Sequence, residues 1–295
     1  MITSPFLVGR DRYERAIEAW ADNTHEDAFT HTVRISDDDC AIELSAVCTP
    51  SPAYEVREAR ARMLAGVVDP AMVTDLSALS GTRMIAGFTK RIADLCGSGA
   101  GAGRLVEAAV EVARLARQVA KLPRDRIAGF DPRDARRCWD LDTAGWTDLP
   151  NSCFTYSDAG KSLLSTGIVC TPMNVQLYAP TPGAEKIFFR RKRSRLVVTE
   201  RRLHLFHSMH DNVHGFDLHY EVDLDSERIV AADSIASRLP YPGICTEPQQ
   251  RMAMMVGKRA DALLGRRIQT TLGGMTGCAQ LYDLTSDLLK LLTFS

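Results

Sequence analysis

Residues 252–291 have the sequence MAMMVGKRADALLGRRIQTTLGGMTGCAQLYDLTSDLLKL, and residues 76–115, LSALSGTRMIAGFTKRIADLCGSGAGAGRLVEAAVEVARL, align with them without a gap. Gly81 meets Gly257, and Arg83 meets Arg259. The two stretches also share glycines at the positions where one helix is expected to end before the next begins. Internal similarity over such a length predicts one structural module used twice.

Each copy is expected to form a helix, a glycine break and a second helix. In the second copy Thr246 is a candidate N-cap for the first helix, residues 273–274 stop it, and Thr276 is a candidate N-cap for the next. Residues 97–103 form the break of the first copy. The apolar positions that recur at helical spacing in the second copy are Met252, Met255, Val256, Leu263, Leu264, Leu281, Leu284, Leu288 and Leu291.

Alternating sequence precedes each helical pair. In FDLHYEVDLDSERIVAAD, residues 216–233, apolar and polar residues alternate, and a polar turn leads into a second strand. Residues 29–47, FTHTVRISDDDCAIELSAV, show the same strand, acidic turn and strand. If these two stretches correspond, the first copy carries an insertion near residues 64–75.

We therefore predict an α+β protein with two tandem similar domains, each an antiparallel β-meander followed by a helical hairpin. Residues 1–120 form a degenerate N-terminal repeat, and residues 188–295 form the repeat that carries the site. Residues 121–187 are expected to be an ordered connecting segment, since a pure linker would not need Trp139 and Trp146. A lid over the site and a plain surface loop are both open for this segment.

Composition excludes several classes of protein. The chain has 295 residues, a net charge of −1 and 45% hydrophobic residues, as in a globular protein without attraction to nucleic acid or anionic membranes. No apolar run is long enough for a signal sequence or a membrane span, so we expect a cytoplasmic protein. The eight cysteines include no CxxC pair, which favours free thiols.

Two glycine-containing stretches resemble nucleotide motifs only superficially. CGSGAGAGR, residues 96–104, follows a helical pattern and not a strand, which favours a helix-hairpin joint over a phosphate cradle. SDAGKS, residues 157–162, lacks the first glycine of a P-loop.

A basic run, RRKRSR at residues 190–195, has two interpretations. The first is a charged entry to a strand that discourages edge pairing. The second is a patch that grips a phosphate-bearing small molecule.

Five of the seven histidines lie within residues 202–223. His207, His210 and His214 have a spacing that a loop could gather around zinc, although no HExxH helix accompanies them. His204 and His219 are expected to face solvent from a strand. His214 differs from these because it lies at a loop-to-strand corner, where a side chain can project into a cleft.

The second half also contains His214 in NVHGFDL, the stretch PYPGIC at residues 240–245, and GCAQL at residues 277–281. With these features, residues 190–292 resemble the bacterial family known only as domain of unknown function 2889. The resemblance implies a fold plan and a site location but no reaction. Gln280 departs from the family pattern, which has histidine there, and this argues against a metal site of two cysteines and two histidines.

The candidate catalytic residues are His214, Tyr241, Cys278 and Asp283, and the candidate substrate-binding residues are Cys245, Gln280, Tyr282 and Trp146. His214 is the general acid or base, with Tyr241, Tyr282 and Asp283 placed to orient it or to bind a polarised carbonyl. Cys278 is expected in the first turn of a helix, which would lower its pKa if it is exposed; a small buried hydrophobe is the alternative.

The first copy has Ala102, Arg104 and Glu107 opposite Cys278, Gln280 and Asp283. It is therefore interpreted as a structural partner whose cleft lost its polar groups.

These observations favour a small-molecule catabolic enzyme of lyase or hydratase type that acts next to a carbonyl, such as that of an aromatic or coenzyme-A-linked acid. A non-catalytic small-molecule-binding or scaffold protein is the alternative, and a zinc-dependent hydrolase is the third hypothesis. We expect no cofactor unless zinc is present, a small-molecule substrate as partner, and a homodimer.

Overall fold

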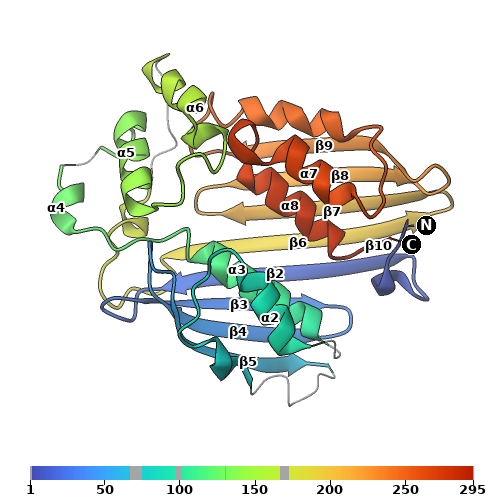
Figure 1. Cartoon of the computed structure of the whole chain (residues 1–295), viewed down its shortest axis with the longest axis horizontal. Helices are drawn as coiled ribbons and strands as arrows, with labels where there is room; N and C mark the ends of the chain where they lie inside the picture. The colour runs from blue at the N-terminus through green and yellow to red at the C-terminus, as the bar shows by residue number, and fades with distance from the viewer. Residues whose placement is uncertain (1, 67–74, 98–100, 130, 167–172, 295) are drawn as a thin grey trace.

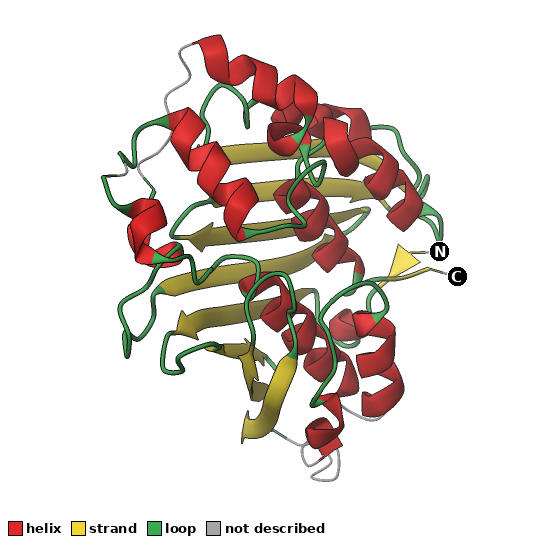
Figure 2. Cartoon of the chain, turned by 60° about the vertical axis from the view of Figure 1, so that its left-hand side comes forward, coloured by secondary structure: helices red, strands yellow, loops and turns green. Residues whose placement is uncertain are grey.

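A computed structural model of the chain describes residues 2–66, 75–97, 101–129, 131–166 and 173–294. Its centre is an eight-stranded antiparallel sheet with the order β5-β4-β3-β2-β6-β7-β8-β9. The helices that follow each set of strands lie on one face of this sheet (Figures 1 and 2). The strands are β2 (Arg12–Asp22), β3 (Phe29–Asp37), β4 (Ala41–Cys48), β5 (Val56–Ala65), β6 (Phe188–Thr199), β7 (Arg202–Asp211), β8 (Gly215–Asp223) and β9 (Arg228–Arg238).

The sheet consists of two four-stranded meanders joined edge to edge. Strands β2 and β6 pair in antiparallel register, with Ile17 opposite Lys192. The α+β class is confirmed. The two halves of the chain share one continuous sheet across this β2–β6 pair.

Equivalent backbone contacts support the alignment of the two glycine-containing stretches. The Gly81 amide donates to the Val56 carbonyl at 2.8 Å, and the Gly257 amide donates to the Ile229 carbonyl at 2.7 Å. Both glycines adopt positive φ angles, 75° and 83°, which a residue with a side chain adopts at a cost. Each half thus anchors the segment before its helical hairpin to the first residues of its last strand.

The predicted correspondence between strands was wrong. Strands β3 and β4 are the second and third of the first meander, whereas β8 and β9 are the third and fourth of the second. The counterparts of β3 and β4 in chain order are β7 and β8, which contain most of the histidine cluster. With that pairing no insertion near residues 64–75 is required; residues 67–74 of that range lie outside the described residues.

Both helical hairpins are present, in α2 (Phe88–Cys96) with α3 (Ala102–Leu115) and in α7 (Leu264–Leu272) with α8 (Ala279–Leu289). Residues 98–100 of the predicted first break lie outside the described residues.

The starts of the helices in the second half differ from the prediction. The segment after Thr246 is a short 3-10 helix, η6 (Glu247–Met255), and the Thr246 side chain makes no capping hydrogen bond. Its counterpart in the first half is η2 (Asp75–Leu79). Thr276 ends another 3-10 turn, η7 (Gly274–Thr276), and α8 starts after Cys278. The single apolar stripe predicted from Met252 to Leu264 is therefore interrupted, because the chain turns at Gly257.

The basic run lies in the centre of the sheet and not at a strand entry or an edge. Strand β6 pairs with β2 on one side and β7 on the other, so its charges cannot act against edge pairing. Arg190 and Lys192 point to the helix face and are buried there beside Glu111 of α3. Lys192 also donates to Asp287 of α8 at 3.2 Å, so buried charges tie both helical hairpins to the central strand.

In its described residues the connecting segment forms helices and 3-10 turns that cover one end of the sheet, on the left in Figure 1. Trp146 is buried and Trp139 is half-buried, so the expectation of a packed segment is met within the described residues. Its elements are α4 (Arg124–Ile127), α5 (Ala135–Gly145), η3 (Phe154–Tyr156), α6 (Asp158–Leu163), η4 (Leu164–Thr166) and η5 (Val175–Leu177).

The two ends of the chain meet at the opposite end of the sheet (Figures 1 and 2). There β1 (Ile2–Thr3) pairs with β10 (Thr293–Phe294), and η1 (Pro5–Leu7) packs against the first half. None of the described helices combines the length and the apolar composition needed to cross a bilayer.

Candidate functional site

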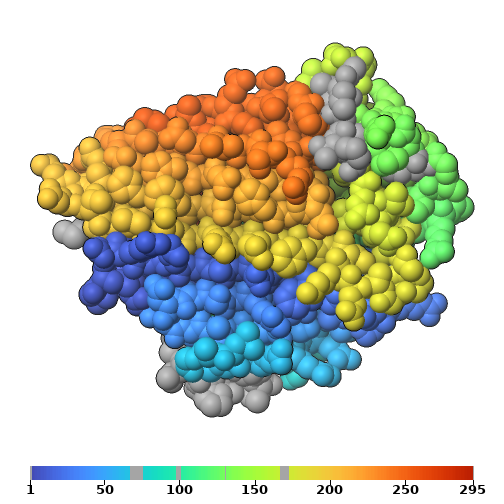
Figure 3. All heavy atoms as spheres, turned by 180° about the vertical axis from the view of Figure 1, so that it is seen from behind, coloured from blue at the N-terminus to red at the C-terminus, as the bar shows by residue number. Residues whose placement is uncertain are grey.

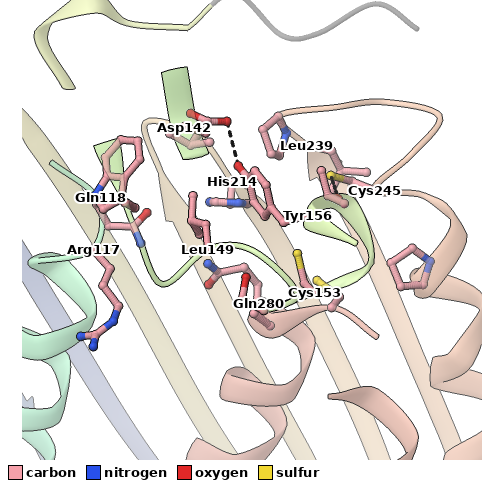
Figure 4. A pocket seen from close by; sticks show the side chains of 18 of the residues that line it. Arg117, Gln118, Asp142, Leu149, Cys153, Tyr156, His214, Leu239, Cys245 and Gln280 are labelled. Carbon is pink, nitrogen blue, oxygen red and sulfur yellow. Dashed lines mark hydrogen bonds between the residues drawn. The ribbon is translucent and has the colours of Figure 1, made fainter. Parts of the chain in front are cut away.

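A cavity of about 130 Å³ lies where the connecting segment meets the β7–β8 hairpin and the start of α8 (Figure 4). Most of its wall is apolar, including Leu149, Leu177 and Phe216. Five of the eight residues predicted for the site line it: His214, Trp146, Cys245, Cys278 and Gln280. The described residues thus bring together side chains that are up to 134 positions apart in the sequence, from Trp146 to Gln280.

The start of α8 is fixed against the connecting segment by close backbone contacts. The amide of Phe154 donates to the carbonyl of Gly277 at 2.9 Å, and the amide of Cys278 donates to Leu272 at 2.8 Å. A Cβ atom at Gly277 would lie 2.0 Å from the Leu272 carbonyl oxygen, so only glycine fits there. This contact points Cys278 and Gln280 into the cavity wall.

His214 is held by the turn that connects β7 to β8. Its amide donates to Oδ1 of Asp211 at 2.6 Å, and its carbonyl accepts from the Asp211 amide at 2.9 Å. The imidazole Nδ1 lies 3.5 Å from the same Asp211 oxygen, which is longer than a good hydrogen bond, and it has no other partner among the described residues. The backbone contacts aim this ring at the cavity.

Arg190 holds the carboxylate of Asp211 in place through two hydrogen bonds. Its Nε and Nη2 atoms donate to Oδ2 of Asp211 at 2.9 and 2.7 Å, and both side chains are buried. Burial by itself would raise the pKa of Asp211, but Arg190, His214 and the backbone amide of His214 lower it well below its usual value. Asp211 is therefore a fixed anion beside the His214 ring.

Asp142 of α5 is the most unusual polar group in the cavity wall, and the sequence analysis missed it. Tyr178 donates to its Oδ1 at 2.5 Å, Tyr156 donates to its Oδ2 at 2.8 Å, and Tyr241 donates to the same Oδ2. Burial raises the pKa of Asp142, although all three phenols act in the opposite direction. Figure 4 shows Asp142 and Tyr156 next to His214, at the upper end of the cavity.

No local sequence signal marks the Asp142 cluster. Two of its tyrosines lie 14 and 36 positions after the aspartate and the third lies 99 positions after it. The only nearby hint is that Trp139 and Trp146 flank Asp142 in a polar segment. Such a cluster forms only when the connecting segment folds over PYPGIC.

Two polar groups in the wall have no protein partner. Trp146 is 6% exposed, and its Nε1–H donor is buried without an acceptor among the described residues. The Gln280 side chain makes no hydrogen bond to any part of the chain that the structure describes, and Figure 4 shows it facing the cavity. A buried donor without an acceptor costs free energy, so a ligand that supplies an acceptor is favoured here.

The cationic group in the wall is already occupied. Arg117 donates from Nε to Asp148 at 2.7 Å, from Nη1 to Ala113 at 2.8 Å and from Nη2 to Met84 at 2.9 Å. Its charge is therefore already paired with Asp148, and three of its five N–H donors are used within the protein.

The thiols in the cavity are poor nucleophiles. Burial raises the pKa of Cys278 to about 11 and that of Cys245 to about 12. Thr155 also contacts Cys245, with Oγ1 3.1 Å from Sγ. The lowering of the pKa that was expected for an exposed Cys278 does not occur, because loss of solvent outweighs the backbone amides at the start of α8. All seven described cysteines are free, as predicted; Cys170 lies outside the described residues.

Three predicted site residues do not line the cavity. Tyr241 is fully buried behind it and contacts its wall through Asp142, Tyr156 and the amide of Cys245. Tyr282 packs on the apolar core of the second half. Asp283 forms an ion pair with Arg114 of α3 at 3.1 Å, so it stabilises the contact between the two helical hairpins and cannot orient His214.

The predicted zinc ligands are not brought together. His207 is buried on the helix face, with Nδ1 2.9 Å from the Leu284 carbonyl, whereas His210 is exposed on the other face and lies near Asp217. His204 and His219 stack with Phe206 on that open face and are half-buried there. In the described parts of the chain, no group of three or more His, Cys, Asp or Glu residues could hold a metal ion.

Comparison with known proteins adds a family but no activity. Residues 191–293 match the model of a family described as a protein of unknown function, DUF2889. This confirms the resemblance of the C-terminal region. No curated protein and no solved structure matches the chain.

Proposed function

We propose that the protein is an enzyme of small-molecule catabolism that performs acid–base chemistry next to a carbonyl group, of lyase or hydratase type, in the cavity at His214. The observation that carries the proposal is the convergence of His214, the buried Asp142 cluster and two unpartnered donors on one small apolar cavity. Perturbed carboxyl groups next to a histidine in a cavity are typical of acid–base sites.

The size and polarity of the cavity favour a neutral carbonyl compound with about one ring. A dry cavity of roughly 150 Å³ accepts benzene, and this one has about 130 Å³. Because the charge of Arg117 is already paired with Asp148, an ester, ketone or aldehyde suits the wall better than a free acid. A coenzyme A ester would place only its acyl end in the cavity.

In this proposal Trp146 and Gln280 bind the carbonyl oxygen. Both can donate a hydrogen bond without losing one to the protein. Donors fixed in a cavity stabilise the negative charge that develops on a carbonyl oxygen when a neighbouring carbon loses a proton.

His214 is the proposed base. The fixed anion Asp211 lies beside its Nδ1, which favours the tautomer protonated on that atom and leaves Nε2 to take a proton from the substrate. Asp211 therefore also stabilises the imidazolium that forms.

Asp142 is the proposed acid for the group that leaves. Its raised pKa lets it hold a proton closer to neutral pH than an exposed aspartate, and it lines the cavity. Tyr241, one of the originally predicted catalytic residues, then acts as a positioning residue for Asp142. Cys278 and Cys245 contribute to the wall and not to covalent chemistry.

Proton exchange provides a test that does not require the natural substrate. Single-ring ketones, aldehydes and esters are incubated with the protein in D₂O, and loss of the proton next to the carbonyl is followed by NMR. We expect exchange with the wild-type protein on at least one compound, and a loss of at least about 100-fold in His214→Ala. His219→Ala, on the opposite face of the sheet, is the matched control and should keep the wild-type rate.

The rival hypothesis is a non-catalytic small-molecule-binding protein, which the tight, largely apolar wall also suits. It predicts that ring-sized carbonyl compounds quench tryptophan fluorescence and bind more weakly to His214→Ala, with no exchange in either protein. Binding without exchange across the whole panel would therefore reject the enzymatic proposal. The lid role of residues 121–187, the cytoplasmic location and the homodimer stay predictions.

A further inference from the structure

The face of the sheet opposite the helices carries a second hollow. Figure 3 shows this face, where the strands themselves form the surface. A groove of about 590 Å³ runs over β2, β3, β6, β7 and β8, and Arg193 and Arg195 of β6 lie in its lining. It shares no lining residue with the His214 cavity.

Arg193 and Arg195 differ from the other arginines of this face. Arg191 pairs with Glu18 at 3.0 Å, and Arg34 pairs with Glu43 at 2.5 Å. Neither Arg193 nor Arg195 has an acidic partner within 4.0 Å among the residues that the structure places. Two neighbouring guanidinium groups on the middle strand are thus left without a counter-charge.

The guanidinium of Arg195 is held in place. Its carbon atom Cζ lies 4.3 Å from the centre of the Phe206 ring, which is a cation–π contact. Its Nε–H donor is buried and has no acceptor in the described chain. Stacking fixes the plane of the group, so little conformational entropy remains to be lost when an anion binds.

The surroundings leave room beside Arg193. In the sheet register Arg193 stands between Ala16 of β2 and Ser208 of β7, which are small residues. Ser36 of β3 is opposite Ala16 and lines the same groove. The two serine hydroxyls add donors at the sides of the guanidinium.

The acids in the lining have partners of their own. Glu14 pairs with Arg12, Asp38 lies 3.3 Å from Arg10, and Asp217 lies 3.4 Å from His210. They therefore narrow the groove but do not neutralise Arg193 or Arg195.

We propose that this groove is a binding site for an oxyanion, the phosphate or carboxylate group of a small molecule, held between Arg193 and Arg195. Residues two apart on a strand point to the same face at a spacing of about 6.6 Å, which lets two guanidinium forks bracket one anionic group. The burial of the Arg195 donor and the small residues around Arg193 fit such a ligand.

Inorganic pyrophosphate and citrate are the probes, titrated into the full chain by calorimetry at low ionic strength. Wild-type protein should bind at least one probe, and the double variant Arg193→Gln/Arg195→Gln should raise its Kd at least about tenfold. Arg191→Gln is the control, because it removes a positive charge from the same strand and face but one that is already paired with Glu18. Its Kd should stay within about twofold of the wild-type value.

Which probe binds identifies the group: pyrophosphate alone indicates a phosphate, and citrate indicates a carboxylate. Absence of binding by the wild-type protein up to about 10 mM of both probes would overturn the proposal. Equal weakening in Arg191→Gln and the double variant would also overturn it, because a general charge effect would then explain the binding. His214→Ala should bind the probes as the wild-type protein does, which separates this site from the cavity.

Discussion

The β3–β4 corner at Asp37 and the β7–β8 corner at Asp211 have the same hydrogen bonds between the aspartate and the backbone, but different side chains surround them. In each, the aspartate amide donates to the carbonyl three residues later, and its Oδ1 accepts the amides two and three residues later. Cys40 occupies the place in the first corner that His214 occupies in the second. One corner is filled by ion pairs, and the other borders the cavity.

The difference arises at the start of the neighbouring helix. Arg104 of α3 donates to Asp37 at 2.7 and 3.0 Å, and Tyr13 donates to the same carboxylate at 2.7 Å. Phe6 from the N-terminal segment stacks on Tyr13 with ring centres 4.8 Å apart and completes the filling. At the second corner the aligned residue is Gln280, which lines the cavity, and Asp211 takes its cation, Arg190, from the sheet.

The comparison corrects the view of the first half as a module whose cleft lost its polar groups. Its corner is highly polar, and Asp37 is paired there with Arg104 and Tyr13. The arginine at the start of the helix pairs with the corner aspartate, whereas the glutamine at the aligned position lines the cavity. The interpretation of the first half as a degenerate copy stays a prediction.

The strongest way to break the comparison is to remove each aspartate. Asp37→Ala leaves Arg104 and Arg15 without a shared anion, and Asp211→Ala does the same to Arg190. Each should lower the free energy of unfolding by about 3 kcal/mol, because buried donors lose their acceptor, although Arg15 keeps Glu107 and Arg190 keeps Glu111. Urea denaturation measures this. The exposed Asp39→Ala should cost below about 1 kcal/mol; similar values for all three variants would show that neither corner depends on its buried pair.

Substituting the residue near the start of each helix, Arg104 or Gln280, by the residue of the other half tests whether this position causes the difference between the corners. Arg104→Gln should cost about 2–3 kcal/mol of stability, because it removes two charged hydrogen bonds to Asp37. Gln280→Arg should retain the fold but weaken binding of ring-sized carbonyl compounds at least about tenfold, since the longer side chain fills the cavity. Gln280→Ala is the control for volume, and unchanged binding in Gln280→Arg would show that the cavity is not the binding site.

Each half contains one buried histidine, His31 or His207, that makes the free energy of unfolding depend on pH. Burial lowers the pKa of His31 on β3 to about 3 and that of His207 on β7 to about 4. The unfolded chain takes up these protons near pH 6.5, so the stabilisation is complete above that pH and is lost as the pH falls toward 4. Lowering the pH from 7 to 5.5 should therefore reduce the free energy of unfolding by about 1 kcal/mol for each histidine.

The two histidines should respond differently to removal. Neither ring nitrogen of His31 has a partner among the described residues, whereas His207 bonds Leu284. His31→Leu should therefore flatten the pH profile without loss of stability at pH 7, and His207→Leu should flatten it with a loss. Denaturation curves at several pH values check this, and an unchanged slope in both variants would contradict the assignment.

The smallest effect concerns Cys278. A thiol with a pKa of about 11 is roughly one part in a thousand thiolate at pH 8, so alkylation of the folded protein should be about 100-fold slower than that of an unfolded thiol. Mass spectrometry of iodoacetamide-treated protein, with Cys278→Ala to assign the peptide, follows the reaction. Fast labelling at neutral pH would restore the nucleophile hypothesis.

Much of the site could be located in the sequence, but the full set of its polar residues could not be predicted from it. His214, Cys278 and Gln280 lie in short stretches whose strand and helix boundaries are visible from alternation and glycine breaks. Asp283 was assigned to the site because it follows Gln280 closely, yet it lies one helical turn further on, where it meets Arg114. Asp142 was missed because its three phenols come from distant positions.

The sequence by itself determined the two helical hairpins, the antiparallel strands and the corner that carries His214, since periodicity, glycine positions and turn residues act over short distances. Only the tertiary structure decided that two meanders join at β2 and β6, that RRKRSR lies in the middle of the sheet, and that Asp142 receives three phenols. These features depend on which buried charges and donors find partners across the whole chain, and no local pattern records that choice.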